Sequence, residues 1–162
     1  MLVNVLNYPF SSAFSLAYHG FLRVGEFTAN SNGKNQTIRI EHFKFKTNHK
    51  SGEHYIELKI HFSKTDQSGK GVLITLEPAK NSICPVLWLK KYLSIRPNVS
   101  GQLFMHLNGS PLTRFQFCSI FNKSLEITGL PKSRYKSHSF RIGAASDSFS
   151  YGHSESEIKK TR

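Results

Sequence analysis

The residues best suited to chemistry lie near the C-terminus, where a histidine and an arginine stand three positions apart. Ser137 is predicted to cap a helix that runs to Tyr151, so His138 and Arg141 would share one face of its first turn. Backbone N–H groups at a helix start lack partners, and an imidazole and a guanidinium beside them make a site suited to phosphate. For this pair taken alone, an ordinary basic surface helix is the alternative.

Two other segments carry residues that suit the same ligand. Arg23 lies near the end of a predicted helix over residues 8–24, off its apolar stripe, and Glu26 follows it. Lys64 sits where a predicted strand enters a turn, and Lys70 across that turn is the weaker candidate. Each has an ordinary alternative. Arg23 could be a solvated helix-end arginine that merely pairs with Glu26, and Lys64 could be a strand-edge lysine that discourages aggregation.

The net charge indicates the class of partner. The 162 residues include 22 Lys and Arg against 10 Asp and Glu, which gives a formal charge of +12. An excess of this size on one domain favours a polyanion, most often nucleic acid. A membrane surface would favour basic residues gathered on one amphipathic helix, whereas here they run from end to end. The length is that of a single domain with its own core.

Cysteine usage and the lack of targeting patterns bear on the compartment. Cys84 and Cys118 are far apart in the sequence and stand in apolar surroundings, which indicates a reducing compartment and no metal cluster. No basic-then-apolar signal opens the chain, and no apolar run approaches membrane-spanning length. We therefore expect an intracellular protein without a membrane partner.

Strand patterns occupy the first half of the sequence. Residues 37–46, 55–63 and 72–76 have the alternation of strands with one buried face, and turns are predicted at 48–53 and 65–71. The apolar parity of the first run slips between Ile40 and Phe43, which a bulge would explain. The pattern predicts an antiparallel three-stranded meander with one face against a core.

Helix patterns dominate the second half. Pro85 opens a helix that ends by Arg96, and a capping box at Thr113 opens another that Gly129 stops. The phenylalanines of the second helix recur at the period of a buried face. The chain therefore has the pattern of a mainly helical α+β domain.

Taken together, three segments resemble the motifs of the tyrosine recombinases, the phage-integrase superfamily, in the form found in mobile elements of eukaryotic genomes. The run 18–26 (YHGFLRVGE) resembles the first arginine box, the run 63–71 (SKTDQSGKG) the β-hairpin lysine, and the run 136–145 (KSHSFRIGAA) the second box. The resemblance covers about residues 8–162, and it rests on the order, spacing and predicted secondary structure of the three motifs.

The resemblance implies a catalytic set: Arg23, Lys64, His138 and Arg141, with Glu26 as a supporting acid. In the family a tyrosine attacks a DNA phosphate. The two arginines would hold its non-bridging oxygens, Lys64 would protonate the leaving 5′ oxygen, and His138 would assist by hydrogen bonding or proton transfer. No metal and no other cofactor is implied. Double-stranded DNA is the implied partner, with a second copy or a longer recombinase beside the chain.

Two expected features of the family are missing from the sequence. The next box and the nucleophilic tyrosine should follow Arg162, and Tyr151 is too close to Arg141 to replace that tyrosine. The chain also begins at the first catalytic helix, without the N-terminal core-binding domain. We therefore expect residues 1–162 to form one recombinase-like catalytic domain that is incomplete at the C-terminus.

Three functions remain open on these grounds. The favoured one is a DNA recombinase or integrase core, involved in DNA recombination and inactive alone without its nucleophile. The second is a non-enzymatic DNA-binding remnant of a mobile element. The third is a basic RNA-binding or scaffold protein that reuses the fold. Whether the chain is an enzyme stays open, and a nuclear location follows if the host is eukaryotic.

Overall fold

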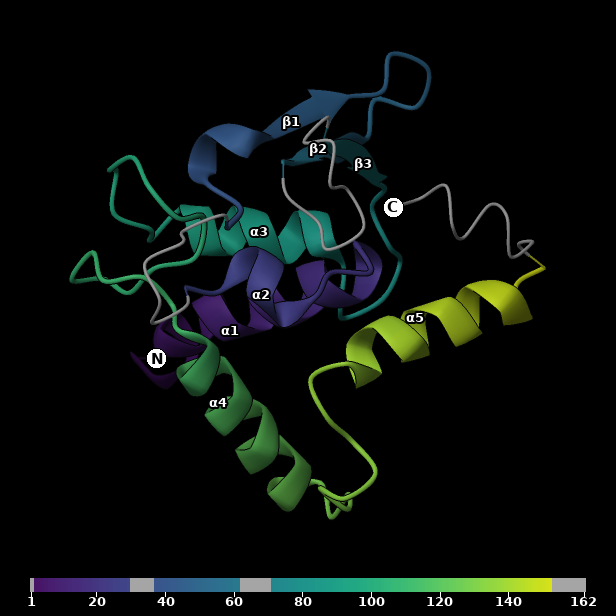
Figure 1. Cartoon of the computed structure of the whole chain (residues 1–162). Coiled ribbons are helices and arrows are strands. Elements are labelled where there is room, and N and C mark those ends of the chain that lie inside the picture. The colour runs from purple at the N-terminus through teal and green to yellow at the C-terminus, as the bar shows by residue number, and fades with distance from the viewer. Residues whose placement is uncertain (1, 30–36, 62–70, 153–162) are drawn as a thin grey trace.

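The protein combines helices with one small sheet, and the sheet lies over the helices in Figure 1. The computed structural model describes residues 2–29, 37–61 and 71–152. The helices are α1 (Leu2–His19), α2 (Val24–Phe27), α3 (Pro85–Leu93), α4 (Arg114–Ile127) and α5 (Ser139–Ser150). A 3₁₀ turn, η1 (Ile40–His42), precedes the strands β1 (Phe43–Thr47), β2 (His54–Ile60) and β3 (Val72–Leu76). The mixture of helices with a three-stranded antiparallel sheet agrees with the predicted α+β class.

The sheet has the order β1-β2-β3, with both neighbouring pairs antiparallel. In its register Phe45 lies opposite Ile56, and Ile56 lies opposite Leu76. Ile56, Leu58 and Ile60 of β2 are buried while the residues between them are more exposed, as their alternation predicts. One face of the sheet therefore closes a core whose other side is helical.

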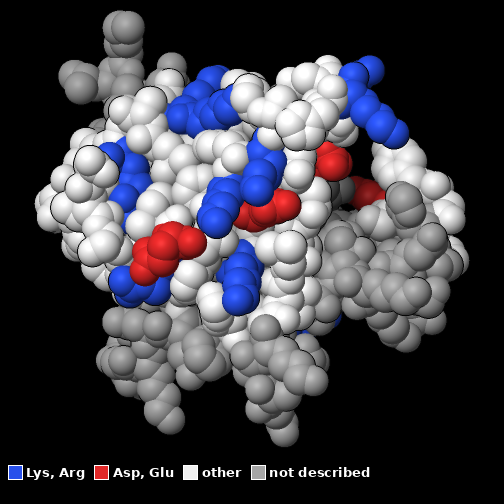
Figure 2. Space-filling model, turned by 90° about the horizontal axis from the view of Figure 1, so that it is seen from above, with Lys and Arg blue, Asp and Glu red and all other residues white. Residues whose placement is uncertain are grey.

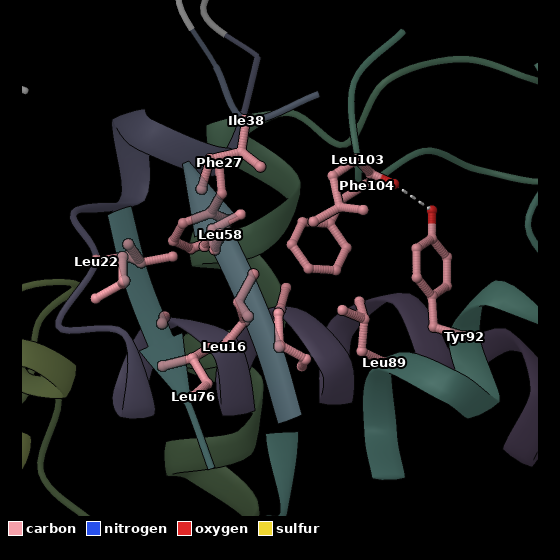
Figure 3. Close-up of a cluster of buried hydrophobic side chains, with 14 of the residues drawn as sticks. Leu16, Leu22, Phe27, Ile38, Leu58, Leu76, Leu89, Tyr92, Leu103 and Phe104 are labelled. Atoms are coloured by element: carbon pink, nitrogen blue, oxygen red, sulfur yellow. Dashed lines mark hydrogen bonds between the residues drawn. The ribbon is translucent and has the colours of Figure 1, made fainter. Parts of the chain in front are cut away.

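That core joins residues from nearly every element (Figure 3). Leu16 of α1 and Leu89 of α3 pack with Leu58 of β2, and each is at most 1% exposed. Tyr92 of α3 is also buried, and its hydroxyl donates to the carbonyl of Leu103 (3.0 Å) and accepts the N–H of Met105 (2.8 Å). These bonds satisfy the buried phenol, and they fix the loop between α3 and α4 against α3.

The predicted bulge before the sheet is wrong. Residues 38 and 39 pair with the 102–103 segment: Ile38 accepts the N–H of Leu103 (2.9 Å), and Arg39 forms a bridge with Gln102. The chain then turns through η1 before β1 begins to pair with β2. The apolar parity slips because the chain changes its pairing partner across a 3₁₀ turn.

The predicted helix over residues 8–24 is also wrong in its bounds. α1 ends at His19, and the N–H groups of Phe21 and Leu22 return to the carbonyls of Tyr18 (3.2 Å) and Ala17 (2.9 Å). This is the Schellman pattern, in which the residue after the C-cap turns left-handed, and Phe21 has φ +50°. Gly25, the expected stop, lies inside α2.

In Figure 1 α4 extends below the rest of the molecule, and α5 lies to the right of α1. α4 begins with the predicted capping box, in which Thr113 accepts the N–H of Gln116 (3.2 Å). Phe117 and Leu125 of α4 are buried, in agreement with the predicted apolar stripe. α5 contacts α1. Within the described part of the chain, no helix combines the length and the apolar character needed to cross a membrane.

Candidate functional site

Arg23 is positioned by the turn that ends α1. The left-handed Phe21 reverses the chain so that Leu22 enters the core, and Arg23 follows as the N-cap residue of α2. Gly20 is required here because a Cβ on it would stand 2.9 Å from the carbonyl oxygen of Leu16. The Arg23 side chain is partly exposed, at 23% of its surface. The guanidinium therefore projects from a well-ordered turn rather than from a fraying helix end.

The Glu26 carboxylate contacts both the backbone and the side chain of Arg23. One carboxylate oxygen accepts the backbone N–H of Arg23 (2.8 Å), and the other lies 3.3 Å from its guanidinium nitrogen Nη1. Glu26 is itself 8% exposed, and its carbonyl accepts the N–H of Ile38 (2.7 Å). A buried carboxylate needs such partners. The pair fixes the side chain of Arg23 and offsets part of its charge.

Arg141, near the other end of the chain, interacts electrostatically with Arg23 and Glu26. It lies in the first turn of α5 and is partly buried. Burial lowers the pKa of Arg141, the positive charge of Arg23 lowers that pKa further, and the carboxylate of Glu26 raises it. Because an arginine stays charged in any case, these interactions indicate that Arg141 lies near Arg23 and Glu26, and the three groups together carry a net positive charge.

Aromatic packing fixes the start of α5. Phe140 stacks on Phe14 of α1, with ring centroids 5.3 Å apart and planes 13° from parallel. It also contacts Phe117 (5.8 Å) and Phe121 (5.0 Å) of α4. The residue next to Arg141 is thus wedged between two helices. Sequence reasoning identified Phe14, Phe117 and Phe121 as core, and it missed Phe140, whose sequence neighbours are polar or charged.

A second contact between α1 and α5 was also missed. The Tyr18 hydroxyl donates to Asp147, and burial, this bond and the charges of Asp147 and Tyr151 raise the pKa of Tyr18 to about 12. Phe14 and Tyr18 are four positions apart on α1, and this spacing does not indicate which residue Tyr18 contacts. Such a pairing between distant segments carries no local signal.

His138 is placed differently from the prediction. Ser137 does not cap α5: the N-cap residue is His138, in the right-handed helical region, and the helix begins at Ser139. The Ser139 hydroxyl instead accepts the N–H of Lys136 (2.9 Å), so the serine that turns the chain is two positions later. The His138 side chain is exposed, and its carbonyl accepts the N–H of Ile142 (3.1 Å).

Lys64 and Lys70 lie outside the described residues, so their positions stay predictions. The strands on either side of that segment end beside the Arg23 turn. A small hollow there is lined by Phe21, Leu22 and Glu26 on one side and by Ile60 and Val72 on the other. The end of β2 and the start of β3, which flank the segment that carries Lys64, therefore lie next to Glu26.

The site is built from charged side chains and backbone groups. Over the ranges 2–29, 37–61 and 71–152, no three His, Cys, Asp or Glu side chains are grouped as metal ligands. Arg23 and Arg141 can bind an anion such as a phosphate, because the planar guanidinium group offers N–H donors to two oxygens of one anion.

This chain resembles known proteins in its three-dimensional structure. No family model matches the sequence, and no curated protein matches it. Among solved structures, the XerH site-specific recombinase bound to its difH substrate in a pre-cleavage complex has a TM-score of 0.62 at 18% identity, over 98% of this chain and 39% of that one. The Flpe–Holliday junction complex has a TM-score of 0.55 at 17% identity, over 93% of this chain and 40% of that one.

The third structure is the Tn1549 transposon integrase (residues 82–397) in complex with circular intermediate DNA. Its TM-score is 0.50 at 12% identity, over 93% of this chain and 48% of that one. The chain thus spans less than half the length of each of these structures. Over nearly all of its own length this chain has the fold of these three structures, which include a site-specific recombinase and a transposon integrase.

Proposed function

We propose that this chain is the catalytic core of a DNA recombinase or integrase of the tyrosine class, and that Arg23 and Arg141 together bind one phosphate of duplex DNA. The observation that carries the proposal is that Arg141 lies within electrostatic reach of Arg23 and Glu26, although the two arginines are more than a hundred residues apart. The fold supports it, because the XerH, Flpe and Tn1549 structures that share the fold are complexes with DNA.

The two arginines suit the charge that develops in phosphoryl transfer. Guanidinium groups bind non-bridging oxygens in two-point fashion, and they need no rearrangement when negative charge grows on those oxygens. Glu26 has a different task. It fixes the backbone and side chain of Arg23, and its negative charge offsets part of the repulsion between the two arginines. Its own oxygens are engaged from within the turn, so we expect it to act through Arg23 rather than on DNA.

The remaining roles are those that the sequence resemblance implies. A tyrosine oxygen forms a bond to phosphorus, the bond from phosphorus to the 5′ oxygen breaks, and Lys64 supplies the proton for that oxygen. His138, exposed just before α5, would donate a hydrogen bond to the same phosphate. The protein would act on DNA inside the cell, in the nucleus if the host is eukaryotic.

The tyrosines beside the site are poor candidates for the nucleophile. Tyr151 is the C-cap residue of α5, ten positions from Arg141, which corresponds to about 15 Å along a helix axis. Tyr18 donates a hydrogen bond to Asp147 and has a pKa of about 12, so it keeps its proton and is a weak nucleophile near neutral pH. We therefore propose that residues 1–162 bind DNA and do not cleave it by themselves.

The first experiment measures binding of a fluorescent 30-base-pair duplex by the whole chain. Arg23→Ala and Arg141→Ala are each expected to weaken binding, and the slope of log affinity against log salt should fall by about 1 in each variant. Arg114→Ala is the matched control, because Arg114 is an exposed arginine at the start of α4. Equal losses in all three variants would contradict the proposed site.

The second experiment tests chemistry with a suicide DNA substrate that traps covalent protein–DNA adducts. The chain alone should give no adduct, whereas addition of a tyrosine-bearing C-terminal recombinase segment should give one that depends on Arg23, Arg141 and Lys64. An adduct on the chain alone would contradict the assignment, and Tyr151 would be the first residue to test. Binding without rescue in trans would favour a non-enzymatic DNA-binding remnant.

A further inference from the structure

The sheet has a second face, which the core does not use. Along β2 the side chains of Ile56, Leu58 and Ile60 point into the core, so the alternate residues point outward. The register of the three strands places seven residues on this outer sheet face: Lys44, Lys46, Tyr55, Glu57, Lys59, Leu73 and Thr75. No helix of the described chain packs on that side in Figure 1, where the sheet is the uppermost layer.

The outer sheet face is basic. It carries three lysines against one glutamate, and Lys44 and Lys59 are exposed. The glutamate, Glu57, lies beside Lys46, at 3.7 Å between Nζ and Oε2. Figure 2 looks down on the molecule from above, and it shows Lys and Arg side chains spread over this face with a few carboxylates between them.

Two histidines, His42 and His61, extend the outer sheet face at the end of the sheet where β1 begins and β2 ends. The rings of His42 and His61 stand 4.4 Å apart between centroids. His42 accepts the backbone N–H of Arg39 at Nδ1 (3.2 Å), so its neutral ring has its other nitrogen available as a donor. Burial lowers the pKa of His42, as do the charges of His61, Arg39 and Lys59, while Glu41 raises it.

We propose that the outer sheet face, together with His42 and His61, is a second contact surface for the phosphate backbone of duplex DNA. Lys44 and Lys46 are two positions apart on one strand, which corresponds to about 7 Å. Consecutive phosphates of one DNA strand are separated by the axial rise of about 3.4 Å and by their rotation around the helix, so lysines at this interval can meet neighbouring phosphates. The single large exposed apolar residue on this described face is Leu73, which argues against a protein partner or a membrane.

This surface is separate from the Arg23 site. The turn that carries Arg23 packs beside Ile60 and Ile74, which point to the inner side of the sheet. The outer sheet face would therefore hold a DNA segment other than the one whose phosphate lies at the two arginines. The choice of DNA as partner rests on the proposed function, whereas the location and charge of the surface do not.

Protonation of His42 beside His61 should strengthen this contact. When two imidazoles are adjacent, a positive charge on one disfavours protonation of the other. The negative charge of a bound phosphate offsets this repulsion. Binding would then be coupled to proton uptake by His42, and because the pKa of His42 is lowered, affinity would increase as the pH falls below the ordinary histidine value. Burial and the charges of His61, Arg39 and Lys59 oppose this protonation and Glu41 favours it, so the surroundings of His42 shift the increase in affinity to lower pH.

The test uses the full chain and the same 30-base-pair duplex. Lys44→Gln with Lys59→Gln should lower affinity about tenfold at moderate salt and reduce the salt slope by about 1.8. Lys80→Gln with Lys123→Gln is the control, since these exposed lysines lie after β3 and on α4. His42→Gln with His61→Gln should remove most of the gain in affinity between pH 7.5 and 5.5. His49→Gln with His54→Gln, at the opposite end of β2, should keep it.

The outcomes separate this inference from the proposed function. Normal DNA affinity and salt slope in the lysine pair variant would overturn the second contact surface, while a loss in Arg23→Ala would still support the arginine site. The reverse pattern, loss in the lysine variant with no effect of the arginine variants, would support the surface and contradict the arginine site. Binding to anionic vesicles or single-stranded RNA in preference to the duplex would overturn the DNA assignment of this face.

Discussion

The hydroxyl of Tyr18, near the end of α1, donates a hydrogen bond to the carboxylate of Asp147 in α5, 129 positions later in the sequence. Phe14, one turn earlier in α1, stacks on Phe140 at the other end of α5. These two contacts hold α5 on α1. Because α1 leads into the turn that carries Arg23 and α5 carries Arg141, they also set how the two arginines lie relative to each other.

Tyr18→Phe should loosen α5 without removing the aromatic ring. The variant loses the bond to Asp147, and we expect the free energy of unfolding to fall by about 1 kcal/mol. Amide hydrogen exchange should become faster in residues 139–150 than elsewhere. Tyr135→Phe, in the loop before α5, is the control and should leave exchange in α5 unchanged. Equal exchange rates in the wild type and Tyr18→Phe would show that the stacking of Phe140 is sufficient to hold the helix.

The same bond predicts a dependence of stability on alkaline pH. The pKa of Tyr18 is raised from 10.0 to about 12, so the folded protein keeps a proton that the unfolded chain releases. The contribution of Tyr18 is therefore complete below pH 10 and is lost as the pH rises from 10 to about 12. Urea unfolding at pH 9 to 11.5 should show a steeper loss of stability in the wild type than in Tyr18→Phe. Parallel curves would contradict the assigned cause.

Local sequence signals predicted much of the fold. The capping box at Thr113, the proline that opens α3 and the alternation of Ile56, Leu58 and Ile60 each depend on neighbouring residues, and each element is present. The family resemblance also pointed to Arg23 and Arg141, which the structure brings together. Their roles, and the position of Lys64, stay predictions.

Contacts between distant segments could not be predicted in the same way. Arg96 shows why: its guanidinium donates to the carbonyls of Pro97 (2.7 Å), Val99 (2.9 Å) and Gln102 (2.9 Å) and so organises a loop, although its position suggested only a helix end. The left-handed Phe21 is a similar case. Bulky residues seldom adopt positive φ, so an apolar residue at helical spacing favoured a longer helix.

Glu26 should be important for stability as well as for the arginine site. Glu26→Ala removes the acceptor for the Arg23 N–H and leaves two guanidinium groups with less opposing charge, so we expect a loss of about 2 kcal/mol in urea unfolding. Glu26→Gln keeps an acceptor and should lose about half as much. Glu126→Ala breaks an exposed pair with Lys132 and is the control, with an expected change below about 0.5 kcal/mol. Equal effects of the two alanine variants would mean that Glu26 is no more than a surface ion-pair partner.

Two glycines should respond to alanine in opposite directions. In Gly20→Ala the new Cβ would stand 2.9 Å from the Leu16 carbonyl oxygen and 3.1 Å from Leu22 Cγ, so the turn before Arg23 must shift, at a cost of about 1–3 kcal/mol. In Gly143→Ala the Cβ would meet the Tyr18 ring at 3.9 Å, an ordinary contact, inside α5. Alanine is favoured over glycine in a helix by about 1 kcal/mol, so this variant should be more stable than the wild type. Thermal unfolding measures both changes, and DNA binding should fall in Gly20→Ala alone, because only that substitution moves Arg23. A Gly20→Ala protein with unchanged stability and affinity would show that the turn tolerates the methyl group and that Arg23 does not depend on its geometry.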